Sequence, residues 1–448
     1  MFYEDYIEQN KEWIDSVFAK LDAKLSRTAV KSREKIPYTL QANGEHDDRS
    51  REPHCWINGF WGGLMWLMYE YTKNEDYKLT ALRSEEMQDA AFNDVTGLHH
   101  DVGFMWHILS GANYRLTGDR VARNRNILCA MTLASRFKLN GNYIRAWNGM
   151  TGDGRNSDGW TIIDCMMNLP LLYWASEELG DDRFKQIAMA HADTAMTHHV
   201  RPDGSVNHIV VHDLESGEMI GVHGGQGFSG TSCWTRGEAW ALYGYILSYI
   251  HTGEARYLDT AMTHHVRPDG SVNHIVAHDL VTGEMTEVFG GQGFSSTSCW
   301  TRGESWALYG YILSYIHTGE QRYLETAKKV AHYTIAALAA TDFIVPVDFR
   351  CPEEPVYYDT TAASIMACGL IEIAKAVPEY EQKTYITAAV KILKQLEQFC
   401  NWDDNCDAIL MEGAEDYHGK GQHKPIIYGD FYFTEAILKL KGAEFFPW

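Results

Sequence analysis

The chain has 448 residues, of which 45% are hydrophobic and 12% aromatic, so it can bury a large core. Its 60 acidic and 39 basic side chains give a net charge of −21. That charge argues against nucleic acid or an anionic membrane surface as the main partner.

Apolar residues recur at helical spacing along most of the chain. The predicted helices cover residues 6–21, 62–71, 103–116, 124–137, 162–179, 184–198, 238–251, 304–317, 322–338, 361–376 and 384–398. Polar turns such as TGD (117–119) and HTGE (251–254) suit helix ends capped by glycine. The best strand pattern is SVNHIVVHD (205–213), which we expect to form a hairpin with the ESGE that follows it.

Short and long connections alternate between these helices. This rhythm predicts helical hairpins arranged in a ring, an all-α toroid with short turns on one face and long, aromatic-rich loops on the other. A binding site would lie among the long loops.

Residues 193–258 and 259–324 form a tandem repeat with a constant offset of 66 residues, and 57 of the 66 positions match. Such close identity predicts a duplication that is recent or was introduced by engineering. The junction, YLDTAMTHH (257–265), keeps a helical pattern. We therefore expect one helix-loop-helix unit to have been added to a single domain spanning residues 1–448.

The N-terminus lacks the layout of a secretory signal, and no run approaches the roughly 18 apolar residues that span a bilayer. Nine cysteines stand singly, without a CxxC pair, which predicts reduced thiols in a cytoplasmic protein. The adjacent histidine pairs lack HExxH spacing, and GGQGF (224–228 and 290–294) has no Lys-Ser/Thr after it. We expect no catalytic metal and no cofactor.

Two aspartates stand out by their context. Asp101, in LHHDVGFMW, begins an apolar helix, where capping is the simplest role for it. Asp164 lies in GWTIIDCMMNLPLLYWAS among apolar residues, where a carboxylate must be paired, hydrogen-bonded or protonated. This setting suits Asp164 to general acid catalysis.

Several motifs resemble those of the unsaturated glucuronyl hydrolases, a glycoside hydrolase family, and together they span nearly the whole chain. They are RSREPHCWINGFWGGLMWLMYEYT, LHHDVGFMW, RAWNG, GWTIIDCMMNLPLLYWAS, GGQGFSGTSCWTRGEAWALYG, PVDFRCPEEPVYYDTTAASIMACGLIEIA and YGDFYFTEAIL. The related unsaturated rhamnogalacturonyl hydrolases fit less well. The resemblance implies an (α/α)6 barrel that releases the unsaturated uronic acid from oligosaccharides made by polysaccharide lyases. In that family an Asp protonates the C4=C5 double bond and activates a water that adds at C5.

By motif match, Asp164 would be the general acid and base, and Asp101 its essential neighbour. Residues that match the substrate-lining positions are Trp56, His100, Trp147, His208, Gln226, Trp234, Arg236 and Trp240. Arg236 is the natural partner for the sugar carboxylate. The second copy repeats five of these positions, as His274, Gln292, Trp300, Arg302 and Trp306.

Near the C-terminus, Lys420 and Lys424 could meet a sulfate or a second uronate, or simply lie in a solvated charged loop. The serines found there in family members that act on sulfated fragments are absent. The preference between sulfated and unsulfated substrates therefore stays open.

The duplication has two possible outcomes. The ring expands to an (α/α)7 barrel with a wider cleft, or six hairpins close and one copy is extruded or exchanged with another chain. We favour expansion, because extrusion would expose aromatic helices. We also expect the first copy, which directly follows Asp164, to serve catalysis in a monomer or homodimer that binds an unsaturated uronyl oligosaccharide. A toroid that binds sugar with little turnover is the alternative.

Overall fold

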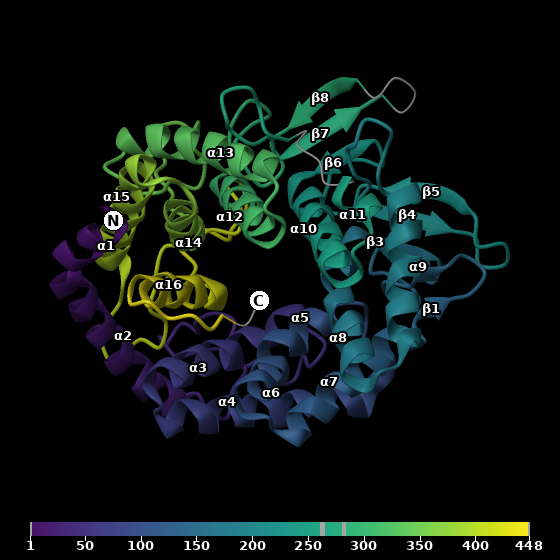
Figure 1. Cartoon of the computed structure of the whole chain (residues 1–448), viewed down its shortest axis with the longest axis horizontal. Helices are drawn as coiled ribbons and strands as arrows, with labels where there is room; N and C mark the ends of the chain where they lie inside the picture. Colours follow the sequence, from purple (N-terminus) through teal and green to yellow (C-terminus); the bar gives the residue numbers. More distant parts are fainter. Residues whose placement is uncertain (1, 260–264, 280–283, 447–448) are drawn as a thin grey trace.

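The computed structural model describes residues 2–259, 265–279 and 284–446, whose helices form two concentric rings (Figure 1). The inner ring contains α3 (Gly59–Thr72), α5 (Val102–Trp106) continued by α6 (Ala112–Thr117), α8 (Leu169–Leu179), α10 (Thr235–Thr252), α12 (Thr301–Thr318), α14 (Thr360–Ala376) and α16 (Ile427–Leu440). The outer ring contains α2 (Lys11–Lys31), α4 (Glu75–Gln88), α7 (Arg120–Ser135), α9 (Asp182–His198), α11 (Ala255–Asp259), α13 (Gln321–Ala339) and α15 (Glu379–Leu396). The N-terminal helix α1 (Phe2–Gln9) packs outside, against α15. This arrangement confirms the predicted (α/α) barrel.

Each inner helix from α3 to α14 turns back to the next outer helix through two residues. In four of these turns, glycines 118, 180, 253 and 319 adopt the left-handed conformation that ends a helix without steric cost. The connections from outer to inner helices are all much longer than two residues, and they carry the strands and loops of one face. The alternation of short and long connections is as predicted.

Both copies of the repeat contribute to the ring. Helix α10 of the first copy lies beside α12 of the second, and α12 in turn packs on α13 and α14 (Figure 1). The part of the chain that the structure describes therefore has an inner ring of seven helical segments, with neither copy extruded. The predicted junction helix at 257–265 falls partly outside the described residues.

Two small antiparallel sheets link neighbouring units on the long-loop face. One contains β3 (Trp160–Ile162), β4 (Ile209–His212) and β5 (Met219–His223), and the other β6 (Ser232–Trp234), β7 (Ile275–His278) and β8 (Met285–Phe289). A short pair, β1 (Phe137–Lys138) and β2 (Tyr143–Ile144), stands apart. The predicted hairpin at 205–213 is confirmed as β4 and β5. In both three-stranded sheets, the hairpin of one unit pairs with the strand that precedes the inner helix of the unit before it: β4 pairs with β3 before α8, and β7 with β6 before α10.

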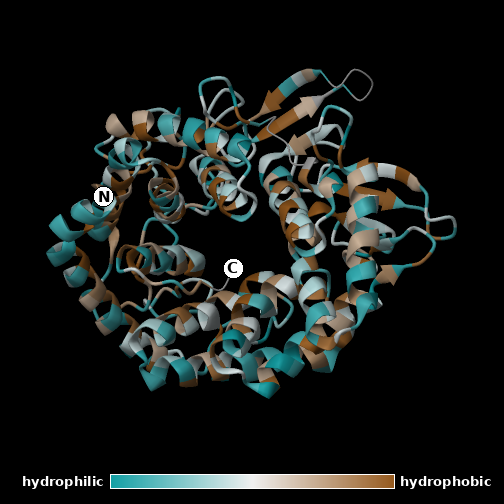
Figure 2. Cartoon of the chain, in the orientation of Figure 1, coloured by the Kyte–Doolittle hydropathy of each residue, from teal (hydrophilic) through white to brown (hydrophobic). Residues whose placement is uncertain are grey.

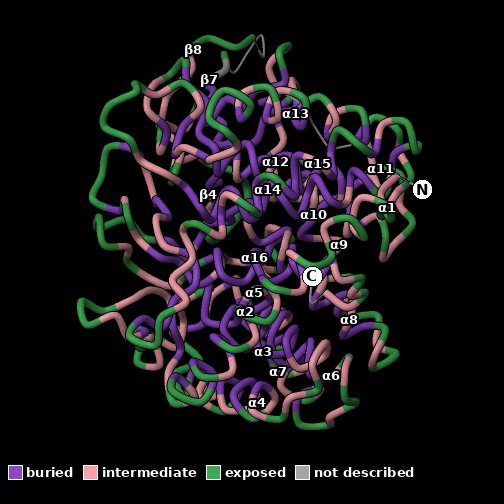
Figure 3. Tube along the Cα trace, turned by 90° about the vertical axis from the view of Figure 1, so that its left-hand side faces the viewer, coloured by how far each residue is buried: buried purple, intermediate pink, exposed green. Residues whose placement is uncertain are grey.

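The core lies between the two rings and around the inner helices. Nearly all of α14 and α16 is buried, whereas the outer helices bury one apolar stripe and expose polar residues (Figure 2). A side view shows buried residues in the interior and exposed ones on the peripheral loops (Figure 3). All nine cysteines lie in the described residues as free thiols, and six are buried, as expected. No helix in the described ranges has the length and apolar character needed to cross a bilayer.

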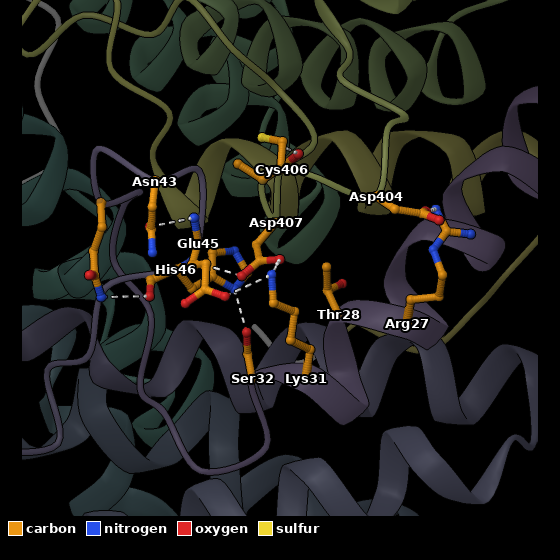
Figure 4. Close-up of polar contacts among 12 residues, drawn as sticks. Arg27, Thr28, Lys31, Ser32, Asn43, Glu45, His46, Asp404, Cys406 and Asp407 are labelled. Carbon is orange, nitrogen blue, oxygen red and sulfur yellow. Dashed lines mark hydrogen bonds and ion pairs between the residues drawn. The ribbon is translucent and has the colours of Figure 1, made fainter.

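The ring closes where the chain's beginning meets its end. Helix α16 packs against α2 and α3. Beside this contact, Asp407 accepts hydrogen bonds of 2.9 Å from the Lys31 ammonium and from the His46 backbone N–H (Figure 4). Ser32 and His46 are also hydrogen-bonded, at 3.0 Å. Asp407, in the loop before α16, thereby links that loop to α2 and to the loop that follows α2.

Two helix predictions need correction, and two helices were missed. The pattern at 6–21 is two helices, α1 and the longer α2, separated at Asn10. The pattern at 162–179 begins as β3 and a 3-10 turn before α8, because pairing with β4 holds residues 160–162 extended. Helices α4 and α16 were not predicted, since α4 has few apolar residues and α16 is buried on nearly every side, so that neither shows a clear apolar stripe.

Candidate active site

Asp164 lies at the point where β3 passes into the 3-10 turn that precedes α8. The neighbouring Ile163 N–H donates to the backbone oxygen of His208, which joins this turn to the first copy. Asp164 Oδ2 lies 3.4 Å from His208 Nε2, and the buried oxygen has no other polar partner among the residues described. The strand register thus presents a carboxylate to an imidazole inside the barrel.

His208 is held so that its Nε2 faces Asp164. His208 Nδ1 lies 3.0 Å from the Gln226 backbone N–H and 3.1 Å from the Gly224 backbone oxygen. In the tautomer in which Nδ1 accepts from Gln226, the shorter of the two contacts, Nε2 carries the proton. The ring also packs on Trp234, with centroids 4.6 Å apart. His208 can therefore donate a hydrogen bond to Asp164.

Asp101 occupies the N-cap position of α5, but its side chain makes no capping bond, so the simple capping role is wrong. Its carboxylate lies 3.1 Å from His99 Nδ1 and 3.5 Å from His100 Nε2. Burial raises the pKa of Asp101, but the attraction of His100 and the hydrogen bond from His99 outweigh it and hold the pKa at about 2. Asp101 is therefore ionised near neutral pH.

Asn168 connects the two aspartates and was missed in the sequence. Its amide nitrogen donates to Asp101 Oδ1 over 3.4 Å and to the Asp164 backbone oxygen over 3.2 Å. Its amide oxygen accepts from the Phe104 N–H at 2.9 Å. The available signal was an amide four residues after Asp164 in an apolar run. Fully buried, Asn168 fixes the start of α8 against the start of α5.

A cavity of about 170 Å³ surrounds both carboxylates. Its lining includes Trp56, His100, Asp101, Phe104, Trp147, Asp164, His208, Gln226, Arg236 and Trp240. Trp56 and Trp147 are 38% and 37% exposed, so their ring faces can meet a sugar. Trp234 lies beneath the wall, with the Arg236 guanidinium 4.3 Å from its ring centre, and Gln226 accepts a hydrogen bond from that guanidinium. Every predicted first-copy residue thus lines or supports one cavity.

The second copy has the same local structure but different neighbours. Ile162 pairs with Ile209 as Trp234 pairs with Ile275, so Arg236 holds the place relative to the second copy that Asp164 holds relative to the first. Accordingly, His274 has no hydrogen-bond partner for either ring nitrogen within the described part of the chain. Burial, and then the repulsion of Arg236, lowers the pKa of His274 to about 3. The second copy faces a cation where the first faces Asp164.

Other second-copy residues line cavities that adjoin the one around the aspartates and share residues with it. Gln292 and Arg302 border a cavity of about 450 Å³ that shares Trp56 and Arg236 with the cavity around Asp101 and Asp164. Trp306 lines an apolar cavity of about 100 Å³. Trp300 is buried beside His274, with centroids 4.6 Å apart. The two copies therefore line two adjoining cavities, and we call these linings the first wall and the second wall. Only the first wall contacts the cavity that contains Asp101 and Asp164.

The C-terminal loop belongs to the second wall. The Tyr417 N–H donates to the Gln292 backbone oxygen, and the Gln292 side chain donates to the Glu415 backbone oxygen, both at 2.8 Å. Lys424 donates to the Glu415 carboxylate over 2.6 Å. Lys420 is exposed and lines neither cavity. The two lysines thus lie apart from Asp164.

Comparison with known proteins places this geometry in a family. The chain is 32% identical over 395 residues to the unsaturated glucuronyl hydrolase of Bacillus sp. strain GL1, and the match covers 86% of each chain. The chain belongs to the unsaturated glucuronyl hydrolase family. The unsaturated glucuronyl hydrolase of Formosa agariphila is 37% identical over 402 residues, covering 86% of this chain and 79% of that one. No family model matches.

The crystal structure of the Bacillus enzyme superposes with a TM-score of 0.63 at 28% identity, covering 96% of this chain and 97% of that one. The barrel is therefore that of the unsaturated glucuronyl hydrolases, and the chain is a glycoside hydrolase by family.

Proposed function

We propose that the protein releases the unsaturated uronic acid from the non-reducing end of lyase-generated, glycosaminoglycan-type oligosaccharides. Family membership supports the reaction class. The observation that carries the assignment to residues is the pair Asp164 and His208, 3.4 Å apart, with ionised Asp101 in the same aromatic cavity. A carboxylate pair beside exposed tryptophans suits acid catalysis on a sugar ring.

In the proposed reaction, Asp164 gives its proton to C4 of the double bond, and positive charge develops at C5. A water adds its oxygen to C5 and returns a proton to Asp164. The resulting hemiketal opens and releases the remaining sugar. His208 orients Asp164, and the negative charge of Asp101 stabilises the cationic transition state.

Arg236 is the proposed partner of the uronate carboxylate. Its guanidinium lies over Trp234 and is fixed by Gln226, which leaves further donors for a ligand. The second cavity, which begins at Arg236 and Trp56, would receive the rest of the oligosaccharide. Since Lys424 is already paired with Glu415, sulfated and unsulfated substrates should both be assayed.

We further propose that the enzyme acts in the cytoplasm as a monomer or homodimer. The nine free thiols support a reducing compartment.

The experiment follows the ultraviolet absorbance of unsaturated disaccharides, which disappears when the double bond is hydrated. Wild type should consume a chondroitin-type disaccharide, and Asp164→Asn should lose activity while remaining folded. Asp153→Asn, at an exposed loop carboxylate, is the matched control and should match wild type. If wild type and Asp164→Asn show the same absence of decay, the protein is a sugar-binding toroid. Turnover of the rhamnose-linked substrate alone would instead assign it as a rhamnogalacturonyl hydrolase.

A further inference from the structure

Three potential metal ligands meet where the two copies join, and none of them lines the catalytic cavity. They are Cys233 on β6, Glu238 in the first turn of α10 and His265 at the start of the second copy's loop, and all three are buried. Glu238 Oε2 lies 2.9 Å from His265 Nε2 and 3.2 Å from Cys233 Sγ. The three ligand atoms all lie within 4.8 Å of one another.

The contacts of His265 suit a metal ligand. Nδ1 lies 2.9 Å from the backbone oxygen of Asn273 and 2.8 Å from the Thr235 hydroxyl, so it is held by polar partners on the side away from the cluster. Nε2 faces a carboxylate oxygen at 2.9 Å. When Nδ1 donates to Asn273, the lone pair of Nε2 is free to bind a metal ion shared with the carboxylate. Zinc-binding histidines are held in this way, with the other ring nitrogen donating to a backbone carbonyl.

The spacing of the ligand atoms fits a tetrahedral ion. Zn–N and Zn–O bonds of about 2.0 Å and a Zn–S bond of about 2.3 Å place the ligand atoms about 3.3 to 3.5 Å apart. The side chains would therefore need to separate by only a few tenths of an ångström. A cavity of about 20 Å³ borders Glu238, His265 and Thr235, enough for one water as the fourth ligand.

Charge balance is also compatible with a bound metal. The thiolate, the carboxylate, a neutral imidazole and Zn²⁺ sum to zero. Binding therefore releases the Cys233 thiol proton and leaves the buried site without net charge.

The second copy provides an internal comparison. Cys299 and Glu304 repeat the first two ligands, 3.1 Å apart. The position 66 residues after His265 is Ala331, and Glu304 instead accepts hydrogen bonds from Val272 N–H and the Thr334 hydroxyl. Among the described residues, the third ligand is present only where the duplication has brought His265 next to Glu238 of α10.

We propose that the duplication created a zinc site in which Cys233, Glu238 and His265, with one water, bind a single Zn²⁺ ion and tie the junction between the copies to α10. The site is independent of the catalytic carboxylates. It belongs to the enlarged ring and has no counterpart in the second copy.

The test uses the full chain, freed of metal with a chelator and titrated with Co²⁺ in place of zinc. We expect one equivalent to produce the visible band of tetrahedral cobalt together with a near-ultraviolet thiolate charge-transfer band. Added Zn²⁺ should abolish both bands, and mass spectrometry should find one zinc per chain. Affinity should rise with pH because a proton is released.

Cys233→Ser, a near-isosteric change, should abolish the charge-transfer band, and His265→Ala should abolish the tetrahedral spectrum. Cys299→Ser is the matched control and should leave both bands unchanged. A folded wild type without these bands overturns the proposal, as does a charge-transfer band that survives in Cys233→Ser. The wild-type titration decides the question even if His265→Ala fails to fold.

Discussion

Arg302 donates two hydrogen bonds to the buried carboxylate of Asp359, at 3.0 and 2.7 Å. Its counterpart in the first copy, Arg236, donates to Gln226 at the cavity around Asp101 and Asp164 instead. We expect a barrel with one copy to place a single arginine next to both Asp164 and Asp359. On that expectation, the duplication divides these two positions between two residues.

We therefore expect the same substitution to lower stability in the second copy and activity in the first. Arg302→Met leaves Asp359 buried without a counter-charge and should lower the free energy of unfolding by about 3 to 5 kcal/mol. Arg236→Met should change stability by less than about 1 kcal/mol but lower kcat/KM about 100-fold, because the substrate carboxylate loses its partner. Chemical denaturation and steady-state kinetics on both variants measure the two effects. Comparable loss of activity in both would show that the second wall also holds the uronate.

The two glutamines should differ in the same sense. Gln226 holds Arg236 at the catalytic cavity, so Gln226→Ala should lower kcat/KM by about tenfold. Gln292 supports the loop at Glu415, so Gln292→Ala should lower the melting temperature and leave kcat/KM within about threefold. Equal kinetic losses would contradict the assignment of catalysis to the first copy.

Asn168 should act as a positioning residue. Asn168→Ala removes the hydrogen bonds that it makes to Asp101 and to the turn carrying Asp164, and should lower kcat by about 100-fold with a smaller change in KM. Asn168→Asp keeps the size but replaces the donor by an acceptor beside Asp101, so it should not restore the rate. Circular dichroism checks the fold. A normal kcat with reduced stability would limit Asn168 to a structural role.

His274 should make the protein less stable in acid. Its pKa is about 3 in the folded state and near 6.5 when unfolded, so the unfolded chain binds the proton first. Above pH 6.5, His274 is neutral in both states and does not affect the free energy of unfolding. As the pH falls from 6.5 towards 3, the free energy of unfolding decreases by up to about 1.4 kcal/mol per pH unit. His274→Gln should therefore gain stability relative to wild type between pH 7 and pH 5, measured by urea denaturation. His418→Gln, at an exposed loop, is the control, and parallel curves for all three proteins would refute the expectation.

Removing residues 259–324 should reunite the divided site. The shortened chain would place one arginine between Asp164 and Asp359, and kcat/KM should rise by at least about tenfold because catalytic geometry tolerates little displacement. The deletion also removes His265, so the cobalt spectrum should disappear. An unchanged kcat/KM would mean that the wider cleft does not hinder the reaction.

The sequence predicted the ring and most of its helices because apolar periodicity and glycine turns are local properties. Asp164 was found through a local conflict, a carboxylate in an apolar run. Asn168 was missed because one amide in such a run follows no pattern. The pairing of Arg302 with Asp359 and the meeting of Cys233 with His265 depend on which units become neighbours. That information resides in the closed ring and in no single segment.

Asp407 accepts hydrogen bonds from Lys31 and His46 where α2 ends. Helix α2 lies on the opposite side of the ring from α10 of the first copy (Figure 1). The seam that closes the barrel is thus separate from the place where it grew. We expect insertion of a whole unit at the repeat to leave the contacts of this seam in place, with the remaining hairpins sharing the change in curvature. On that expectation, barrel diameter changes by whole units while the seam stays the same.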